Sequence, residues 1–500
     1  MNSKIKPVVL LLLLCVSLAT AAEDFVVSGC RRSPYREELA LRRALGASGA
    51  ERKPGGDFYH GDRRQLVVLA SFADRTFLGN EAETLEQWDK IFNAVGLDEA
   101  PFVGSLHDYF HAQSYGQLNL QFDLHYVQLP DEHAKYGSTI INDENSQFLV
   151  KDVVDVLGER DIDWSLYDWN GDGYVNQLLI VFAGKGSGYG GFGGGFNAIW
   201  PHQLWMTQHK DPSTNEMLQP LAVTNADGST LLVDCYCAVP ELRYNGTYSS
   251  FGIICHEYSH CFGFPDFYSG ATNYVGGWDI MGSGYYNNDG FCPSGYSAHE
   301  RWLMGWLTPT ELTETAAIAD MPDLSEQGTA YLIRNEGCNS EYYMVENRQQ
   351  KGWDAGVPGS GILVYHIDYD ANLWTGIFQY PNTDSRQHYV IIPANNSSYN
   401  SASNAANWAY PYADNNMLTN TSEPAATLFN ANTDGSMLMN KSILDISVTD
   451  GLASFNFTVD DPTAINELST VGKYQILYDL GAVCIVRCQN GEIKKVVKQH

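Results

Sequence analysis

The sequence has few basic residues for its length. Among 500 residues, 30 lysines and arginines stand against 59 aspartates and glutamates, which gives a formal net charge of −29. A nucleic-acid-binding protein needs the opposite sign, because its affinity comes largely from neutralising phosphates. We therefore expect no nucleic-acid partner. The negative charge favours solubility and the binding of cations, calcium included.

Long apolar runs are absent after the first residues, so we expect no membrane span. Residues 1–22 combine a basic start, MNSKIK, with an apolar run, PVVLLLLLCVSLA, and small residues near Ala21 and Ala22. This order is typical of a secretory signal peptide, and the run is too short for a membrane anchor. We expect a secreted or cell-surface protein that meets the secretion machinery through this segment.

The sequence also lacks a phosphate-binding loop. The glycine-rich stretch GSGYGGFGGGF, residues 186–196, is not followed by a helix-opening Lys-Ser or Lys-Thr pair. Hydrophobic residues make up 44% of the chain and aromatic residues 12%, which indicates a globular protein and excludes a disordered one. We interpret the glycine-rich stretch at residues 186–196 as a flexible loop.

Hydrophobic patterning predicts an α+β fold for the first three fifths of the chain. Apolar runs predict buried strands at residues 64–74 and 176–186. Helical spacing of apolar residues predicts helices at residues 104–118 and 147–159. From about residue 325, short alternating runs separated by Gly, Asn and Pro predict an all-β region, which we interpret as a sandwich.

These sequence patterns divide the chain into five parts. In chain order, they are the signal peptide at 1–22, a short pro-segment or linker at 23–62, a catalytic domain at 63–320, a β-sandwich domain at 321–460 and a short β tail at 461–500.

The stretch HEYSH carries the chemistry. On a helix, His256 and His260 are four residues apart and point from one face. Two neutral imidazoles on one face suit Zn²⁺. Glu257 can reach a water at the metal without binding the metal itself, and there it can act as the general base for attack on a carbonyl. The alternative is a helix that carries two histidines by chance.

The residues that follow favour the metal site. Gly263 can adopt the left-handed conformation that ends a helix, and Asp266 can then return toward the metal as a third ligand. The stretch GGWDIMGSGYYN, residues 276–287, predicts a tight turn in which Met281 packs beneath the ligands. The fourth metal position stays open for water, as in catalytic zinc sites.

Two tyrosines follow this methionine. The phenol of Tyr285 or Tyr286 could donate a hydrogen bond to the oxyanion of a tetrahedral intermediate. Simple aromatic packing explains the pair equally well.

The stretch DWNGDGYVN, residues 168–176, predicts a structural calcium loop. Side chains of Asp168, Asn170, Asp172 and Asn176 and the carbonyl of Tyr174 fall at the ligand spacing of an EF-hand loop. Leu179 stands where an EF-hand has its bidentate Glu, and a strand follows in place of a helix, so we expect related chemistry without an EF-hand. The alternative is an acidic turn that binds no metal.

The pattern HExxHxxGxPD and the stretch WDIMGSG together resemble the immune inhibitor A family of secreted metallopeptidases, within the metzincin-like zinc endopeptidases. The resemblance extends through QLVVLASFADRTF, DYFHAQSYGQLNL, AHERWLMGW and GILVYHID, and covers about residues 64–370. It implies a zinc-dependent protease with calcium sites, in which Asp266 is the third zinc ligand. The tail, which contains KYQILYDLGAVCIVRC, resembles the C-terminal sorting domain of type IX secretion.

The expected function is therefore that of a secreted zinc endopeptidase acting on peptide bonds of extracellular proteins. The alternative is a non-catalytic surface adhesin or binding protein whose zinc site is structural. Glu257 disfavours this alternative, because a structural site needs no general base and prefers four protein ligands.

Overall fold

The structure is a computed structural model of the whole chain. It describes residues 57–138, 145–187, 198–243, 245–248, 251–269, 272–374, 381–382, 386–399 and 402–459, and the three strands 474–479, 483–488 and 493–497. The proposed signal peptide, the pro-segment up to residue 56 and most of the glycine-rich loop lie outside the described residues.

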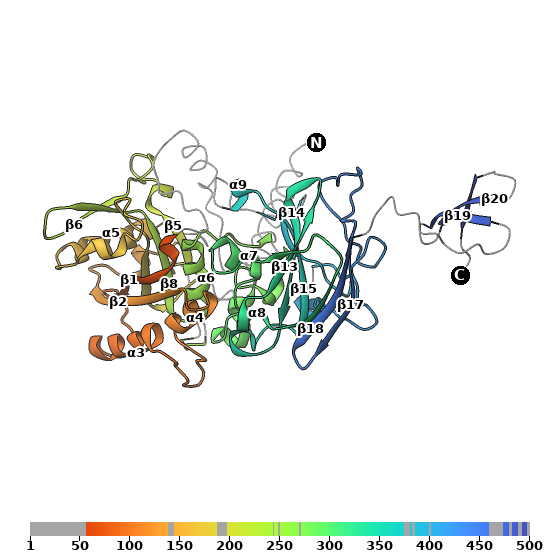
Figure 1. Cartoon of the computed structure of the whole chain (residues 1–500). Coiled ribbons are helices and arrows are strands. Elements are labelled where there is room, and N and C mark those ends of the chain that lie inside the picture. Colours follow the sequence, from red (N-terminus) through yellow and green to blue (C-terminus); the bar gives the residue numbers. More distant parts are fainter. Residues whose placement is uncertain are drawn as a thin grey trace, which may run out of the picture.

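The first half of the described chain builds a five-stranded sheet in the order β2-β1-β4-β8-β5. Four strands are parallel, and β5 runs antiparallel to β8 at one edge. Their bounds are β1 (Gly61–Ser71), β2 (Leu118–Gln128), β4 (Leu178–Lys185), β5 (His202–Trp205) and β8 (Cys235–Leu242). The central strands are buried on both faces, as expected for parallel strands covered by helices (Figure 1).

Helices and short elements surround this sheet. Asn80 and Ser105 close capping boxes at the starts of α3 and α4, which satisfy backbone N–H groups that a helix leaves without partners. The helices are α3 (Glu81–Asn93), α4 (Leu106–Gln113), α5 (Ser146–Gly158) and α6 (Phe251–Cys261). The side strands are β3 (Tyr174–Val175), β6 (Leu221–Thr224) and β7 (Thr230–Val233), and the 3₁₀ turns are η1 (Asp57–Tyr59), η2 (His133–Lys135), η3 (Trp164–Tyr167) and η4 (Met206–Gln208).

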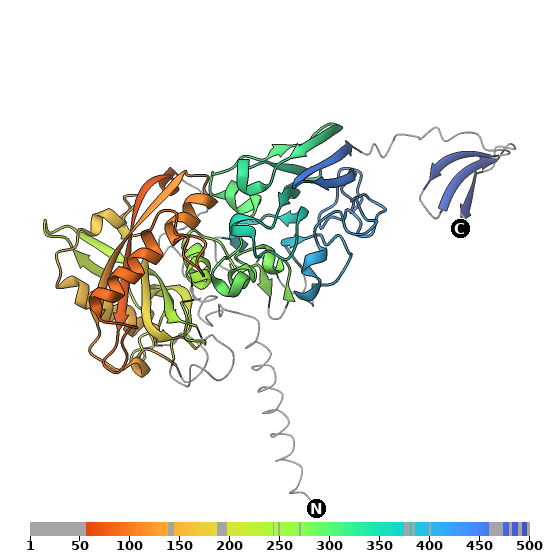
Figure 2. The same cartoon turned by 90° about the horizontal axis from the view of Figure 1, so that it is seen from below.

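A connecting region of short elements follows α6. It lies between the first sheet and the later sheets, in the green part of the ribbon in Figures 1 and 2. Its elements are β9 (Tyr268–Ser269), β10 (Thr272–Asn273), η5 (Gly276–Trp278), η6 (Gly284–Gly290) and α7 (Ala298–Leu303).

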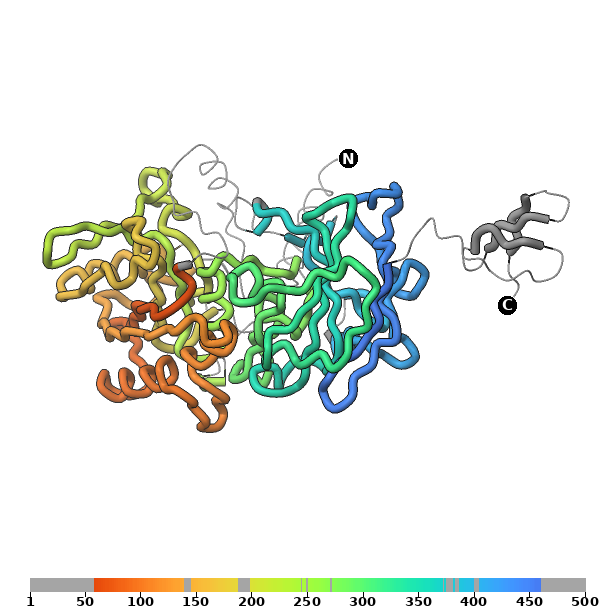
Figure 3. Tube along the Cα trace, in the orientation of Figure 1, coloured from red at the N-terminus to blue at the C-terminus, as the bar shows by residue number. Residues whose placement is uncertain are grey.

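The later part of the chain forms two further sheets, in the orders β11-β13-β14-β15-β16 and β12-β18-β17. The trace in Figure 3 passes from the first sheet through the connecting region into these two sheets. The strands are β11 (Thr310–Glu311), β12 (Ala316–Met321), β13 (Ala330–Asn335), β14 (Cys338–Arg348), β15 (Gly361–Asp368), β16 (Tyr389–Ile391), β17 (Lys441–Thr449) and β18 (Leu452–Val459). The helical turns are α8 (Leu324–Gln327), η7 (Gly352–Asp354), α9 (Ala371–Trp374) and η8 (Ala402–Asn407).

Two hydrophobic clusters form the cores. The smaller one is shared by the two later sheets and includes Val345 of β14, Val364 of β15 and Phe455 of β18. The larger one fills the first sheet and its helices, and it also contains Met344 and Tyr365 from the later strands. One core therefore contains residues from both sides of the domain boundary expected near residue 320, and that boundary stays a prediction.

Most elements expected from the sequence are present. The strand expected at 64–74 is β1, which begins three residues earlier, and the strand expected at 176–186 is β4. The helices expected at 104–118 and 147–159 are α4 and α5. The alternating runs after residue 325 form β13 to β16. Strand β8 was not predicted, because Pro240 interrupts its apolar run, although it lies between β4 and β5.

The tail forms a small sheet of its own from β19 (Tyr474–Asp479), β20 (Val483–Cys488) and β21 (Ile493–Val497). This agrees with the short β tail expected from its sequence pattern. Among the described residues, none of the helices has the length and the apolar character needed to cross a bilayer.

Candidate metal centre

Helix α6 carries the HEYSH stretch in a fully buried setting. Every residue from Phe251 to Cys261 is buried. Tyr258 anchors the helix to the first sheet, because its hydroxyl donates to Oε1 of Gln65 in β1 at 2.8 Å and accepts from Nε2 of Gln177 at 2.8 Å. The helix also packs closely on η6, where Gly252 leaves no room for a side chain: an added Cβ would lie 2.1 Å from the carbonyl oxygen of Tyr285.

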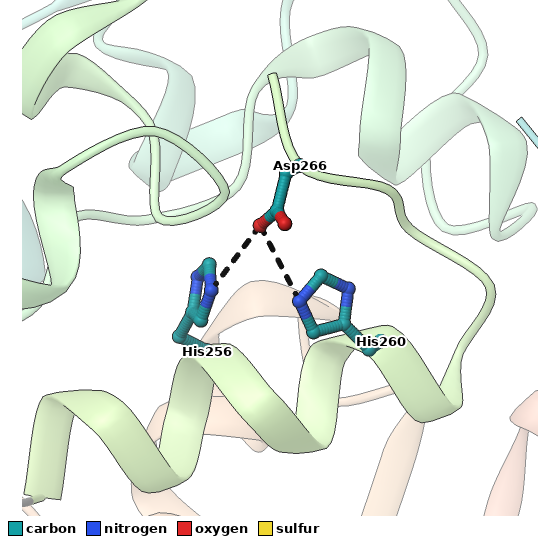
Figure 4. A group of neighbouring side chains, drawn as sticks. All are labelled: His256, His260 and Asp266. Atoms are coloured by element: carbon teal, nitrogen blue, oxygen red, sulfur yellow. Dashed lines mark ion pairs between the residues drawn. The ribbon is translucent and has the colours of Figure 1, made fainter. Parts of the chain in front are cut away.

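The chain turns sharply after α6 and returns to it, as the glycine predicted. Gly263 has a φ of +95°, and its N–H donates to the carbonyl of His260 at 3.0 Å. The turn carries Asp266 back over the helix face that bears both histidines (Figure 4). Oδ1 of Asp266 lies 3.4 Å from Nε2 of His256 and 3.4 Å from Nε2 of His260.

Backbone carbonyls set the orientation of both imidazoles. Nδ1 of His256 lies 2.7 Å from the carbonyl oxygen of Ile280, and Nδ1 of His260 lies 2.7 Å from that of Phe264. A carbonyl only accepts, so Nδ1 of each ring carries the proton. In the neutral imidazole the lone pair then lies on Nε2, the nitrogen that faces Asp266.

The three side chains fit a divalent metal ion. Their donor atoms lie within 4.8 Å of one another. Oδ1 of Asp266 is buried and has no hydrogen-bond partner among the described residues, which is costly unless a cation satisfies it. Burial alone would raise the pKa of Asp266, but the positive charge that His260 and His256 carry when protonated outweighs that effect and holds the pKa below its ordinary value. Two imidazoles and one carboxylate are the donor set of a catalytic zinc site.

The methionine turn lies against this group. Met281 is fully buried, and its carbonyl accepts the N–H of Phe267, the residue after Asp266, at 3.0 Å. Its N–H donates to Oδ1 of Asp279 at 2.8 Å. The turn therefore holds the backbone next to Asp266, and through the carbonyl of Ile280 it holds His256.

Sequence reasoning missed the role of Asp279. This residue is fully buried, and burial raises the pKa of its carboxyl to about 7. A signal was available, since an acidic residue two positions before a buried methionine can cap the turn through its side chain.

Tyr285 contacts the metal group through its ring. Its centroid lies 4.4 Å from that of His256 and 4.1 Å from that of Tyr286. The guanidinium of Arg243 lies 5.5 Å from the centroid of the Tyr286 ring. These contacts fit the packing alternative. The role of either phenol as an oxyanion donor stays a prediction.

Glu257 is fully buried beside His256. Burial and then the charge of Glu257 raise the pKa of the Cys237 thiol of β8 well above its ordinary value. In the described part of the chain, the group of donors within metal-binding distance comprises His256, His260 and Asp266 without Glu257.

The loop at residues 168–176 is closed by its own hydrogen bonds. Asp168 accepts backbone N–H groups from Gly171 at 2.9 Å, Asp172 at 3.1 Å and Gly173 at 2.9 Å. Asp172 accepts from Nδ2 of Asn170 at 2.9 Å and from the N–H of Tyr174 at 2.9 Å. Oδ1 of Asn176 accepts the N–H of Trp169 at 2.5 Å. These bonds also fit the alternative of an acidic turn, and the calcium site stays a prediction.

Residues 66–304 match the family of immune inhibitor A peptidase M6, catalytic domain. This part of the chain is similar to an M6 catalytic domain. The metal group and the methionine turn both lie within the matched residues. The match makes this part of the chain a metallopeptidase domain, a hydrolase, and together with the His-His-Asp group it implies zinc.

Two relatives of the M6 domain carry names that agree with this match. Immune inhibitor A of Bacillus thuringiensis subsp. alesti is 26% identical over 267 residues, which is 45% of this chain and 37% of that protein. Pre-pro-metalloprotease PrtV of Vibrio cholerae serotype O1 (strain M66-2) is 29% identical over 173 residues, or 29% of this chain and 16% of that protein. The chain thus spans well under half the length of either relative.

Proposed function

We propose that this chain is a secreted zinc endopeptidase that hydrolyses peptide bonds in extracellular proteins. The observation that carries the proposal is the convergence of His256, His260 and Asp266 next to a buried Glu257 inside the M6 match. His256, His260 and Asp266 are the proposed ligands of zinc. When bound there, zinc would supply a Lewis acid that polarises a water and the scissile carbonyl.

The other residues around the metal position have the roles of general base, oxyanion donor and backbone support. Glu257 takes a proton from the attacking water as general base and then delivers it to the leaving nitrogen as general acid. Tyr285, whose ring lies on His256, is the proposed donor to the developing oxyanion, with Tyr286 as the second choice. Met281 packs beneath the ligands and holds their backbone in place.

The proposal also assigns a role to each part of the chain. We assign residues 63–320 to a metzincin-like catalytic domain and residues 321–460 to a β-sandwich, on the support of the cluster that the two later sheets share. Residues 1–22 are the proposed signal peptide, and residues 461–500 a sorting tail for secretion. A structural calcium ion at residues 168–176 is part of the same proposal.

Replacing Glu257 tests the central assignment. Glu257→Ala should abolish hydrolysis of a mixed peptide substrate and leave the zinc content unchanged, because Glu257 supplies a base and no ligand. Loss of one general base lowers the rate by at least about 10²-fold. Peptide cleavage is followed by mass spectrometry and zinc by elemental analysis.

His260→Ala is the matched control, and it should lose both activity and zinc. If Glu257→Ala also loses its zinc, the residue is a ligand and the assignment is wrong. If the wild-type chain binds zinc but cleaves no peptide with or without a chelator, the alternative of a binding protein with a structural zinc site replaces the proposal.

A further inference from the structure

The residue after the third ligand is held by a segment far along the chain. Phe267 follows Asp266 directly and is fully buried. Its N–H donates to Met281 within the metal region, but its carbonyl accepts Nδ2 of Asn382 at 2.9 Å. Its ring stacks on that of Tyr389, with centroids 3.9 Å apart and an interplanar angle of 23°.

Asn382 is itself fixed by strand β16. Its Oδ1 accepts the N–H groups of His388 and Tyr389, both at 2.9 Å, and its Nδ2 also donates to the carbonyl of Tyr389 at 2.7 Å. Asn382 is 1% exposed, so these bonds form away from water. The amide therefore ties the backbone beside Asp266 to β16.

Tyr389 makes a second connection, to the methionine turn. Its hydroxyl donates to Oδ2 of Asp279 at 3.3 Å and lies 2.6 Å from Oγ of Ser297. The other oxygen of Asp279 accepts the N–H of Met281, and the carbonyl of Ile280 orients His256. One tyrosine thus contacts the supports of two ligands, Asp266 through its ring and His256 through its hydroxyl.

We infer that Asn382 and Tyr389 are positioning residues of the metal centre, although both lie beyond residues 66–304 of the M6 match. The inference rests on the proposed function, since it assumes that the group binds zinc. Neither side chain touches the metal position. They act by holding Phe267 and Asp279, so that Oδ1 of Asp266 and Nε2 of His256 stay at metal-binding separation. Partners behind metal ligands typically change metal affinity by about 10- to 100-fold when they are removed.

Zinc affinity of the full-length protein tests this inference. Asn382→Ala removes the amide that holds Phe267, and Tyr389→Phe removes only the hydroxyl and keeps the stacked ring. Each should raise the zinc dissociation constant by about tenfold or more. The constant is measured by competition with a chromophoric chelator, and the thermal midpoint of the metal-free protein is measured in parallel.

Tyr343→Phe is the matched control. Tyr343 is equally buried, and its hydroxyl donates to the carbonyl of Thr427 at 2.6 Å, but it belongs to the smaller core between the two later sheets. Tyr343→Phe should lower the thermal midpoint of the metal-free protein about as much as Tyr389→Phe does and leave zinc affinity unchanged. If Asn382→Ala does not fold, Tyr389→Phe against Tyr343→Phe decides the question.

The outcomes separate this inference from the proposed function. Variants that bind zinc as tightly as the wild type, or a control that weakens zinc equally, would overturn the inference alone. A wild-type chain that binds zinc and cleaves no peptide would overturn the proposed function and leave the positioning role intact.

Discussion

At the scale of single residues, burial decides the protonation of His133. His133 in η2 is 3% exposed, and its ring packs edge-on against Phe72 with centroids 4.8 Å apart. Burial, followed by the charge of Arg75, lowers its pKa to about 4, while Asp74 opposes the shift only in part. The folded protein therefore keeps this imidazole neutral at a pH where the unfolded chain protonates it.

This difference predicts a loss of stability in mild acid. An unfolded histidine has a pKa near 6.5, so the unfolded chain binds a proton below that pH, and the folded state does so only near pH 4. The stability that neutral His133 contributes is complete above pH 6.5 and falls as the pH drops toward 4. Between pH 7 and pH 5 the wild type should lose about 2 kcal/mol of unfolding free energy through this residue.

Urea denaturation of the wild type and of His133→Gln at pH 7 and pH 5 measures the effect. The variant cannot titrate at this position, so its loss between the two pH values should be smaller by about 2 kcal/mol. Equal losses in the two proteins would show that His133 does not carry the effect.

At the scale of elements, helix α6 depends on how closely it approaches η6. Gly252 lies in α6, and an added Cβ there would meet the carbonyl oxygens of Tyr285 at 2.1 Å and Gly290 at 3.1 Å. The close approach positions Tyr285 against the ring of His256. A glycine inside a helix lowers its intrinsic stability, so its presence here serves the packing.

Gly252→Ala should therefore destabilise the protein even though alanine favours helices. We expect a loss of about 3 kcal/mol, because the clash is with backbone and cannot be relieved by a side-chain rotation. Gly158→Ala at the end of α5 is the control, since, apart from its chain neighbours and its own helix backbone, nothing in the described part of the chain lies within 4 Å of its added Cβ. It should stabilise the protein by about 0.5 to 1 kcal/mol. Equal effects of the two variants in denaturant titrations would contradict this account.

The acidic loop at residues 168–176 gives a second prediction at this scale. If it binds calcium in the folded state only, free calcium at about a hundredfold excess over its dissociation constant stabilises the fold by about 2 to 3 kcal/mol. A calcium-selective chelator should then lower the thermal midpoint of the zinc-loaded wild type. Asp172→Ala should have the same lowered thermal midpoint whether or not the chelator is present. An unchanged wild-type midpoint would leave the loop as an acidic turn.

At the scale of the whole molecule, a buried ionic network joins the M6 match to the sheet that follows it. The guanidinium of Arg348 in β14 is fully buried and donates to Asp354 at 2.6 and 2.7 Å and to Glu346 at 3.0 Å. It also donates to the carbonyl of Gly295 at 3.2 Å, and Glu346 accepts the N–H of Ala298 in α7 at 2.6 Å. The hydrogen bonds to Gly295 and Ala298 join the M6 match to β14. The bonds to Asp354 and Glu346 hold the guanidinium of Arg348 in place.

Breaking this network should destabilise the whole protein. Asp354→Asn removes one charge and leaves Arg348 buried with a single carboxylate, which typically costs about 3 to 5 kcal/mol. The control is Glu326→Gln, which breaks the exposed ion pair of Glu326 with Lys351 and should cost less than about 1 kcal/mol. Both are measured by urea denaturation of the zinc-loaded chain, and similar losses would contradict the role assigned to the network.

The sequence by itself determined the parts of this protein that depend on neighbours along the chain. The four-residue spacing of His256 and His260 places both rings on one helix face, and Gly263 allows the turn that returns Asp266. Each of these relations spans a few residues, so helix geometry and backbone freedom were enough to predict them. The structure confirms that the three side chains converge.

Only the tertiary structure decided what supports them. Asn382 contacts Phe267 across a separation of 115 residues, and Tyr389 contacts Asp279 across 110. No periodicity or spacing in one sequence encodes such a pair, because its members meet only after the sheets and cores between them have formed. The same holds for strand order: the pairing of β4 with β1 and β8 follows from burying both faces of the sheet at once, a condition that no single segment satisfies alone.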